Sequence, residues 1–437
     1  MDIYISEGEI IDRYTILEIK QTEIKDLIKK EEINKEIILY KKFDNIKKKY
    51  ILYFKLLYFI NYRIWNLQNE IKTLEKIDFE YAEKCNLIFE YNQSRFRIKD
   101  IINKMANSQI KEQKSYNTNE AFINIDNENE ENFNNLIYLI FKYDKINVYF
   151  NDNLSPRFVA IIKSLFPILN YVGIKNDDMY NFDKIETNLI NNFINLELKN
   201  LFNPIFYRAE GKLGDFILQL SIINEKFIES GRMGILYISN DVYKFTFPLE
   251  HTFKDTYDLV ISQNYIQDFK IWNSEFYEIN LSSWYLRRDL LFKNSWHNIF
   301  KNEYKINWGV HKWIKTKIEK EYNDKIVVTY KESSLTNLLI NTLLQFPKEK
   351  LLLIGYSEND YIEFKKVCKL DIKFIKCKTI EDMAIIINNC HTFIGGLSSP
   401  LTLAQATHIN TIALLGYGGD NNHNLLNDIL PNYTIKR

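Results

Sequence analysis

Phe393-Ile-Gly-Gly-Leu-Ser-Ser-Pro-Leu-Thr-Leu-Ala-Gln-Ala-Thr-His-Ile-Asn-Thr-Ile-Ala-Leu-Leu-Gly416 is the stretch that decides the fold. Its apolar residues predict a short buried strand over 392–394 and a second one over 411–415. The glycine pair and the two serines between them predict a tight turn, because glycine adopts backbone angles that other residues resist. Pro400 predicts the first turn of a helix, where its missing N–H costs nothing. The stretch is therefore predicted to be a strand–helix–strand unit of a parallel sheet.

The turn in this stretch lies where parallel sheets bind their ligands. Ligands bind beyond the carboxyl ends of such strands, and a helix N-terminus at that position suits an anion. Gly395 and Gly396 form the turn, and Ser398 and Ser399 would add hydroxyl donors to the free N–H groups of the helix. An ordinary strand–helix turn without a ligand is the alternative, because a fold does not fix a function.

Length and composition predict a large globular protein with reduced thiols. The 437 residues suggest roughly three domains, and 57 basic against 57 acidic residues argue against a general nucleic-acid binder. Neither a CxxC spacing nor paired histidines accompany the cysteines, which are Cys85, Cys368, Cys377 and Cys390. Acidic residues interrupt the opening, and no apolar run is long enough for a membrane span. We expect a cytoplasmic protein that could attach peripherally to the inner face of the membrane.

The first 110 residues predict an all-helical domain. A capping box at Ser6 predicts a helix from there to about residue 30, followed by helices over 33–74 and 79–105. No proline interrupts these ranges, which suits a helical hairpin or a small bundle. Charges on the first helix, such as Asp12, predict a solvated face, with a polar site as the less common alternative.

The start of the chain resembles a family of small, mostly helical bacterial proteins of uncharacterised function. The resemblance lies in residues 5–20 and in a Leu-Trp-x-x-x-x-x-Ile-rich second helix, similar here to Ile64-Trp-Asn-Leu-Gln-Asn-Glu-Ile71. It covers about the first quarter of the chain. It implies a domain boundary but no activity, and such a domain could recruit partners or form an oligomer.

A polar stretch over 111–136, rich in Asn and Glu, predicts a surface linker. Beyond it, alternating strands and helices predict two Rossmann-like domains, over 137–310 and 311–437. The first is expected to hold strands at 145–150, 205–208, 233–239, 257–262 and 276–281. The second is expected to begin with a helix at 310–321 and to hold strands at 326–330, 351–354, 373–375 and 392–394. The predicted fold class is α/β, with doubly wound parallel sheets after an all-α domain.

A second glycine turn, Gly211-Lys-Leu-Gly214, follows the strand predicted at 205–208. It is not a phosphate-binding P-loop, because Lys212 lies between the glycines and no Gly-Lys-Ser/Thr follows. One carboxylate, Asp215, stands at the start of the next helix, at the mouth of a parallel sheet. It could serve the chemistry of a site, or it could simply cap the helix, which is a favoured role for Asp.

A third group of residues combines aromatic rings with positive charge. Trp284 is followed by Arg287 and Arg288 in what the sequence predicts as exposed loops or short helices. Aromatic faces pack on sugar rings, and Arg side chains bind anions, so the group suits a sugar- or phosphate-bearing acceptor. The same composition is also common at protein interfaces.

The two glycine motifs together resemble the heptosyltransferase-type glycosyltransferases of glycosyltransferase family 9. The motifs are Gly-x-x-Gly-Asp after a strand and Phe-Ile-Gly-x-x-Ser-x-Pro, and the resemblance covers about residues 200–437. It implies the GT-B architecture of two Rossmann-like domains, with the acceptor in the first and the nucleotide sugar in the second. It also implies transfer without a metal ion.

The resemblance assigns roles to individual residues. Asp215 matches the carboxylate that is the candidate general base, while Lys331 and Glu358 match donor-side residues that follow two strands of the second domain. The family usually carries Asp-Ser-Gly-x-x-His in the phosphate turn. The corresponding places here hold Leu397, Ser398, Ser399 and Thr402. The departure implies either a different donor or a site that has lost its activity.

The resemblance therefore implies an inverting, metal-independent glycosyltransferase of hexosyl- or heptosyl-transferase type. Its donor would be a nucleotide-diphosphate sugar, with no cofactor, and its acceptor a cell-surface glycan or lipid-linked saccharide. Residues predicted on the acceptor side are Gly211, Lys212, Gly214, Trp284, Arg287 and Arg288. Residues predicted on the donor side are Lys331, Glu358, Gly395, Gly396, Ser398, Ser399 and Thr402. The alternative is a catalytically inactive GT-B-like scaffold whose helical domain recruits partners.

Overall fold

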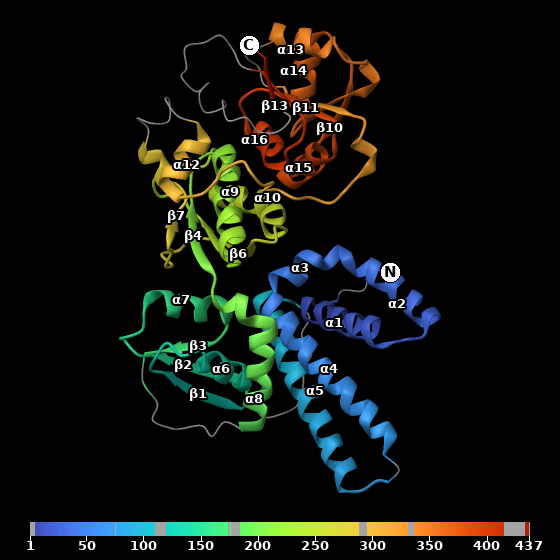
Figure 1. Ribbon diagram of the computed structural model, residues 1–437, viewed down its shortest axis with the longest axis vertical. Helices are drawn as coiled ribbons and strands as arrows, with labels where there is room; N and C mark the ends of the chain where they lie inside the picture. The colour runs from blue at the N-terminus through green and yellow to red at the C-terminus, as the bar shows by residue number, and fades with distance from the viewer. Residues whose placement is uncertain are drawn as a thin grey trace. The chain divides into compact units, whose positions relative to one another are not determined.

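The computed structural model describes residues 5–74, 76–109, 119–173, 175, 184–287, 295–330, 336–414 and 433–436. The chain divides into two compact units, Met1–Asn203 and Pro204–Arg437 (Figure 1). This division differs from the predicted domain limits, because the first unit contains more than the helical domain and the second contains both larger sheets.

The first unit opens with helices, of which α4 and α5 lie side by side as a long hairpin (Figure 1). The helices are α1 (Glu7–Glu23), α2 (Leu27–Tyr40), α3 (Asp44–Lys49), α4 (Ile51–Thr73) and α5 (Phe79–Met105), with a 3-10 turn η1 (Lys41–Phe43). The prediction for α5 is confirmed. The helices predicted up to residue 30 and over 33–74 are longer than those in the structure. The first ends earlier because Asp26 caps a new helix by accepting hydrogen bonds from the N–H groups of Ile28 and Lys29, both at 3.0 Å.

Asp12 does not lie on a solvated face, contrary to the sequence expectation. Its side chain is 0% exposed and accepts two hydrogen bonds from the guanidinium of Arg95, from Nε at 2.8 Å and from Nη2 at 2.5 Å. The side-chain amide of Asn61 donates to the same carboxylate at 2.9 Å. Buried charges are tolerated when they are paired and hydrogen-bonded, so this cluster joins α1, α4 and α5 inside the bundle.

The rest of the first unit is a small parallel sheet in the order β1-β2-β3. Its elements are β1 (Glu120–Ile125), α6 (Glu131–Lys142), β2 (Lys145–Phe150), α7 (Pro156–Leu165), β3 (Asn170–Val172), α8 (Lys184–Phe193), η2 (Ile194–Leu198) and η3 (Lys199–Phe202). The linker predicted at 111–136 is therefore wrong for its second half, because β1 lies there. The strand predicted at 145–150 is confirmed as β2, but it belongs to this sheet and not to the acceptor-side domain.

The second unit begins with a four-stranded parallel sheet in the order β6-β5-β4-β7. Its elements are β4 (Ile205–Ala209), α9 (Leu213–Ser230), β5 (Gly234–Ile238), α10 (Leu249–Ile261), β6 (Ile266–Ile271), β7 (Ile279–Asn280), η4 (Ser283–Arg287) and α12 (Trp296–Tyr304). The strand predicted at 257–262 is wrong, because this short apolar run ends α10 and the strand follows it. Short apolar runs do not distinguish a buried strand from a buried helix.

A second parallel sheet follows in the order β10-β9-β8-β11-β12-β13. Its elements are η5 (Lys320–Tyr322), β8 (Ile326–Val328), α13 (Thr336–Leu343), η6 (Lys348–Lys350), β9 (Leu351–Gly355), α14 (Glu358–Cys368), β10 (Lys373–Lys376), α15 (Ile380–Asn389), β11 (Thr392–Gly395), α16 (Ser399–Thr407), β12 (Thr411–Leu414) and β13 (Tyr433–Lys436). Numbered in chain order, its strands run 3-2-1-4-5-6, which is the order of a doubly wound dinucleotide-type fold.

The helix predicted at 310–321 is wrong. This segment is irregular up to the short turn η5, and its backbone bonds to other parts of the unit. The N–H groups of Trp313 and Ile314 donate to the carbonyl of Ala406, at 3.1 and 3.3 Å. The indole of Trp313 donates to the carbonyl of Ile217 on α9 at 2.9 Å, so the segment ties the two halves of the unit together.

One hydrophobic core runs through both sheets of the second unit. Val327 and Leu352 belong to this core with residues of α15 and α16, whereas Val328 and Leu353 point the other way and form a second core with residues of α13 and α14. Helices α9 and α16 pack against each other, and so do α10 and α15. The predicted α/β class with two Rossmann-like sheets in the GT-B arrangement is confirmed. Within the described ranges, every helix is too short or too polar to cross a membrane.

Candidate active site

A cavity of about 1360 Å³ lies between the two sheets of the second unit. Its walls include the turns that follow β4, β8, β9 and β11, so it opens at the carboxyl ends of both parallel sheets. It also reaches the points where the strand order reverses, between β4 and β7 and between β8 and β11. Open parallel sheets bind their ligands at such positions.

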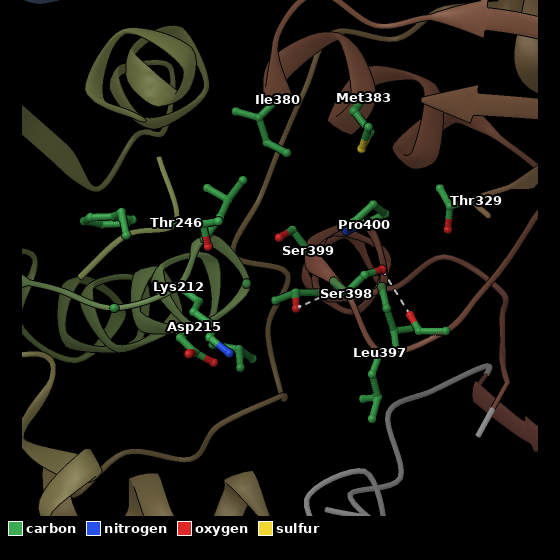
Figure 2. Close-up of a pocket in the computed structure, with 18 of the residues that line it drawn as sticks. Lys212, Asp215, Thr246, Thr329, Ile380, Met383, Leu397, Ser398, Ser399 and Pro400 are labelled. Atoms are coloured by element: carbon green, nitrogen blue, oxygen red, sulfur yellow. Dashed lines mark hydrogen bonds between the residues drawn. The ribbon is translucent and has the colours of Figure 1, made fainter. Parts of the chain in front are cut away.

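The N-termini of α9 and α16 meet at this cavity. Figure 2 shows Lys212 and Asp215 on one side and Leu397 to Pro400 on the other. The helices approach closely at Gly214, where a Cβ would lie 3.3 Å from the Thr402 Oγ1 and 3.6 Å from the Ser399 Cα. The two glycine turns singled out in the sequence therefore lie together in space.

Neither of these two helices is capped by a side chain among the described residues. The hydroxyl of Ser398, at the N-cap of α16, donates instead to the carbonyl of Gly396 at 3.1 Å. By contrast, α14 and α15 of the same sheet each carry a capping box, formed by Ser357 with Asp360 and by Thr379 with Asp382. The first-turn N–H groups that face the cavity are therefore left for another acceptor, and an anion is the acceptor that a helix N-terminus favours.

Asp215 lies in the first turn of α9, where its carboxylate is bound by a tyrosine and not used as an N-cap. The N-cap of α9 is Lys212, and the hydroxyl of Tyr285 donates to Asp215 Oδ2 at 2.5 Å. Burial raises the pKa of Asp215 above 3.8, although the hydrogen bond from Tyr285 and the charge of Lys212 oppose this rise. A carboxylate with a raised pKa in a cavity is a candidate for proton transfer.

Tyr285 belongs to a stack of three aromatic rings on the cavity wall. Its ring centroid lies 4.2 Å from that of Tyr243 and 3.9 Å from that of Trp284. Gly211, with φ +110°, makes room for it, because a Cβ at this position would lie 2.2 Å from the Tyr285 hydroxyl. Trp284 is buried, contrary to the expected exposure, and its Nε1 has no partner among the described residues.

Some predicted site residues lie away from the cavity or outside the described part of the chain. Glu358 is exposed and does not line the cavity, because it starts α14 on the outside, while Asp360 lines it. Gly395 ends β11 beneath the turn, where a Cβ would lie 2.6 Å from the Thr329 Oγ1. Lys331, Arg288 and the side chain of Arg287 lie outside the described residues.

Sequence reasoning missed the residues that complete the wall around Asp215. Tyr285 and Tyr243 carry no motif, and Tyr285 is 70 positions from Asp215 along the chain. The only available signal was position, because Tyr285 directly follows the predicted acceptor residue Trp284. Further wall residues without a sequence signal are Thr246, Asp255, Thr329, Tyr356 and Met383.

The pH dependence of the site can be predicted from Asp215 and Tyr285. If Asp215 accepts a proton, activity should rise with pH as this carboxyl loses its proton. We call this rising part of the pH profile the acid limb, and its midpoint should lie above 3.8 because burial raises the pKa of Asp215. The Tyr285 hydrogen bond favours the ionised form, so Tyr285→Phe should move this limb to higher pH. The measurement is the pH profile of kcat/KM for both proteins.

Tyr265→Phe is a matched control for that substitution. The Tyr265 hydroxyl is buried in the same half of the unit, where it donates to the carbonyl of Trp313 at 2.5 Å, and Tyr265 does not line the cavity. We expect some loss of stability in this variant and no movement of the acid limb. A limb that stays in place in Tyr285→Phe would contradict the electrostatic role of Tyr285.

Comparison with known proteins gives a likeness to solved structures only. No protein-family model matches the sequence, and the curated proteins give no match. The E. coli heptosyltransferase WaaC with ADP-2-deoxy-2-fluoro heptose is 7% identical, with a TM-score of 0.30 over 54% of this chain and 93% of that chain. The E. coli ADP-heptose lps heptosyltransferase II is 8% identical, with a TM-score of 0.32 over 54% and 90%.

A glycosyl transferase family 9 protein from Veillonella parvula is 9% identical, with a TM-score of 0.26 over 74% of this chain and 88% of that chain. Heptosyltransferases are thus among the structures that this chain is similar to, as its two glycine motifs predict. The likeness concerns the fold. The resemblance of the first quarter to a small helical family stays a prediction.

Proposed function

We propose that this chain is a glycosyltransferase that transfers a sugar from a nucleotide-diphosphate sugar to a saccharide acceptor. The observation that carries the proposal is the meeting of two uncapped helix N-termini at the cavity, with Asp215 in the first turn of one of them. A helix N-terminus stabilises a diphosphate, and a carboxylate opposite can take the proton of an attacking hydroxyl.

In the proposed reaction, Asp215 takes the proton of the acceptor hydroxyl as its oxygen attacks the anomeric carbon. The bond between that carbon and the diphosphate oxygen breaks with its electron pair going to the diphosphate. The negative charge that develops there would be stabilised by the first-turn N–H groups of α16 and by the hydroxyls of Ser398 and Ser399. A single displacement of this kind inverts the anomeric centre, and we propose that it needs no metal ion.

The rim of the cavity supports an acceptor with an apolar part. Val242, Phe247 and Leu397 line the cavity and are 68%, 60% and 50% exposed. Exposed apolar side chains at the mouth of a site gain free energy when an apolar ligand covers them. We propose a lipid-linked saccharide acceptor and a cytoplasmic protein at the inner face of the membrane.

The diphosphate position can be tested by adding a negative charge at α16. Ser399 is the first residue of this helix and lines the cavity. An Asp there suits the helix dipole, so Ser399→Asp should keep its melting temperature. Repulsion and loss of hydrogen bonds should nevertheless weaken nucleoside diphosphate binding about ten- to a hundred-fold, equivalent to about 1.5–3 kcal/mol. The measurement is calorimetric titration with ADP, GDP and UDP.

Ser155→Asp provides a matched control. Ser155 caps α7 of the first unit, which also has a proline in its first turn, and it does not line the cavity. This variant should bind the nucleoside diphosphate as the unmodified protein does. Unchanged binding of the nucleoside diphosphate by Ser399→Asp would show that the diphosphate does not bind at the N-terminus of α16.

The second candidate is a catalytically inactive scaffold whose helical part recruits partners or forms an oligomer. It is favoured by Leu397, a half-exposed apolar residue where the resembled family carries an Asp in the phosphate turn. A scaffold of this kind has no need to bind nucleoside diphosphates or transfer sugars. Binding without transfer from any sugar of a nucleotide-sugar panel, assayed with and without EDTA, would favour it over the enzyme.

A further inference from the structure

Glu210 is a buried carboxylate that directly follows β4 and precedes the first glycine turn. It is 2% exposed, and both of its carboxylate oxygens are bound. Oε1 accepts hydrogen bonds from the hydroxyl of Ser239, at 2.5 Å, and from the guanidinium of Arg208. Oε2 accepts from the backbone N–H groups of Val242, at 3.3 Å, and Tyr243, at 3.1 Å.

Tyr243 connects this cluster to the candidate active site. Its carbonyl accepts a hydrogen bond from the N–H of Gly211 at 3.1 Å, and its ring stacks on Tyr285 with centroids 4.2 Å apart. Tyr285 in turn donates to Asp215 at 2.5 Å. A continuous series of contacts therefore runs from the Glu210 carboxylate to the Asp215 carboxylate.

We propose that Glu210 is a positioning residue for Asp215. By holding the backbone at Val242 and Tyr243, it fixes the ring on which Tyr285 stacks, and with it the hydrogen bond that Tyr285 donates to Asp215. The proposal rests on the function proposed above for Asp215, and it gives Glu210 no contact with substrate. Glu210 does not line the cavity, so its action passes through the two tyrosines.

A carboxylate suits this position because it stays ionised. Burial alone would raise the pKa of Glu210, but the hydrogen bonds from Ser239, Arg208 and the Tyr243 N–H together lower it below 4.5. Arg208 is itself held, at 4.0 Å over the ring of Trp272 and at 3.0 Å from Asp241. The bonds to Val242 and Tyr243 are therefore present above this lowered pKa and are lost only as the pH falls through it.

The substitution Glu210→Gln distinguishes two ways in which Glu210 could affect the pKa of Asp215: by positioning Tyr285, or by its negative charge alone. A Gln amide has one acceptor and one donor end, so it can satisfy Arg208 or the N–H groups at Val242 and Tyr243, but not both. Removing a nearby negative charge would, by itself, lower the pKa of Asp215. Loss of the Tyr285 hydrogen bond would raise it, so the two explanations predict opposite signs.

The experiment is a ¹³C NMR titration of the full chain labelled at Asp, with the Asp215 signal assigned from Asp215→Asn. The groups that act on the Asp215 carboxyl are Tyr285 and Lys212. The other charged or protonatable side chains of the cavity wall, apart from tyrosines, are Lys244, His251, Asp255 and Asp360. These stay unchanged in Glu210→Gln, and the pKa of Asp215 should rise toward its value in Tyr285→Phe.

Three further variants make the test independent of any loss of folding. Ser239→Ala removes the bonds of this hydroxyl to Glu210 and to the N–H of Asp241, but leaves the bonds from the N–H groups of Val242 and Tyr243 to Glu210, so the pKa of Asp215 should stay in place. Tyr243→Ala leaves Glu210 intact but removes the ring on which Tyr285 stacks, so the pKa of Asp215 should rise. Glu210→Gln added to Tyr285→Phe should raise it no further, because the two act in series.

An unchanged or lowered pKa of Asp215 in both Glu210→Gln and Tyr243→Ala would overturn the proposal. The titration requires no turnover, so its outcome is separate from that of the proposed function. If no sugar is transferred by the unmodified protein, glycosyl transfer fails while the titration still reports on the network. If transfer is found, the acid limb of kcat/KM should move to higher pH in Glu210→Gln.

Discussion

Asp215→Asn is expected to lower the turnover of sugar transfer about 10²- to 10⁴-fold, the usual contribution of general base catalysis. The Asn side chain can still accept the hydrogen bond that Tyr285 donates to Asp215, but it cannot take a proton. Nucleoside diphosphate binding should stay unchanged, because the proposed diphosphate site lies at the N-terminus of α16. The measurement is single-turnover transfer together with calorimetric titration.

The melting temperature is the control for this substitution. A carboxyl whose pKa is raised by folding costs stability in its ionised form, and the cost grows as the pH rises from 3.8 through the folded pKa. Asn removes that cost, so Asp215→Asn should melt no lower than the unmodified protein at neutral pH. A fully active Asp215→Asn variant would end the general-base proposal.

Gly211→Ala is expected to disturb both stability and activity. Gly211 has φ +110°, which other residues rarely adopt, and strain of this kind costs about 1–3 kcal/mol. The new Cβ would also lie 2.2 Å from the Tyr285 hydroxyl, so the ring must move away from Asp215. We expect a lower melting temperature and an acid limb displaced in the same direction as in Tyr285→Phe.

Gly231→Ala is the matched control for the glycine substitution. Gly231 ends the same helix, α9, with φ +69°, and a Cβ there meets nothing within 4 Å. This variant carries backbone strain without the collision, so it should lose about 1–2 kcal/mol of stability and keep its pH profile. Equal pH profiles in the unmodified protein, Gly211→Ala and Gly231→Ala would show that Gly211 is not needed to position Tyr285.

The parts of the fold that the sequence predicts are those with local signals. The strand–turn–helix at 392–407 has a glycine pair and a proline at the right spacing, and its elements appear as β11 and α16. Helix α5 has a cap at Asp78 and helical periodicity, and its predicted limits agree with the structure. The two glycine turns also have local signals, and their meeting at one cavity follows from the topology of the sheets.

The errors lie where tertiary contacts decide the outcome. Residues 257–262 are apolar and could form either element, but packing places them in α10. Strand β1 lies in a polar stretch and has only a short alternating pattern of buried residues, at Ala121, Ile123 and Ile125. The Tyr285–Asp215 bond and the Glu210 cluster join residues far apart in the chain, and no periodicity or spacing marks such pairs. Glu358 was placed by family resemblance, which does not determine which face of α14 meets the cavity.

Calorimetric titration with nucleoside diphosphates tests the central claim most directly, because that claim places a donor at the uncapped N-terminus of α16. The account predicts that one of ADP, GDP and UDP binds the unmodified protein and Asp215→Asn with equal affinity. Ser399→Asp should bind it about ten- to a hundred-fold more weakly. Binding of none of the three by the unmodified protein, or equal binding by all three proteins, would contradict the account.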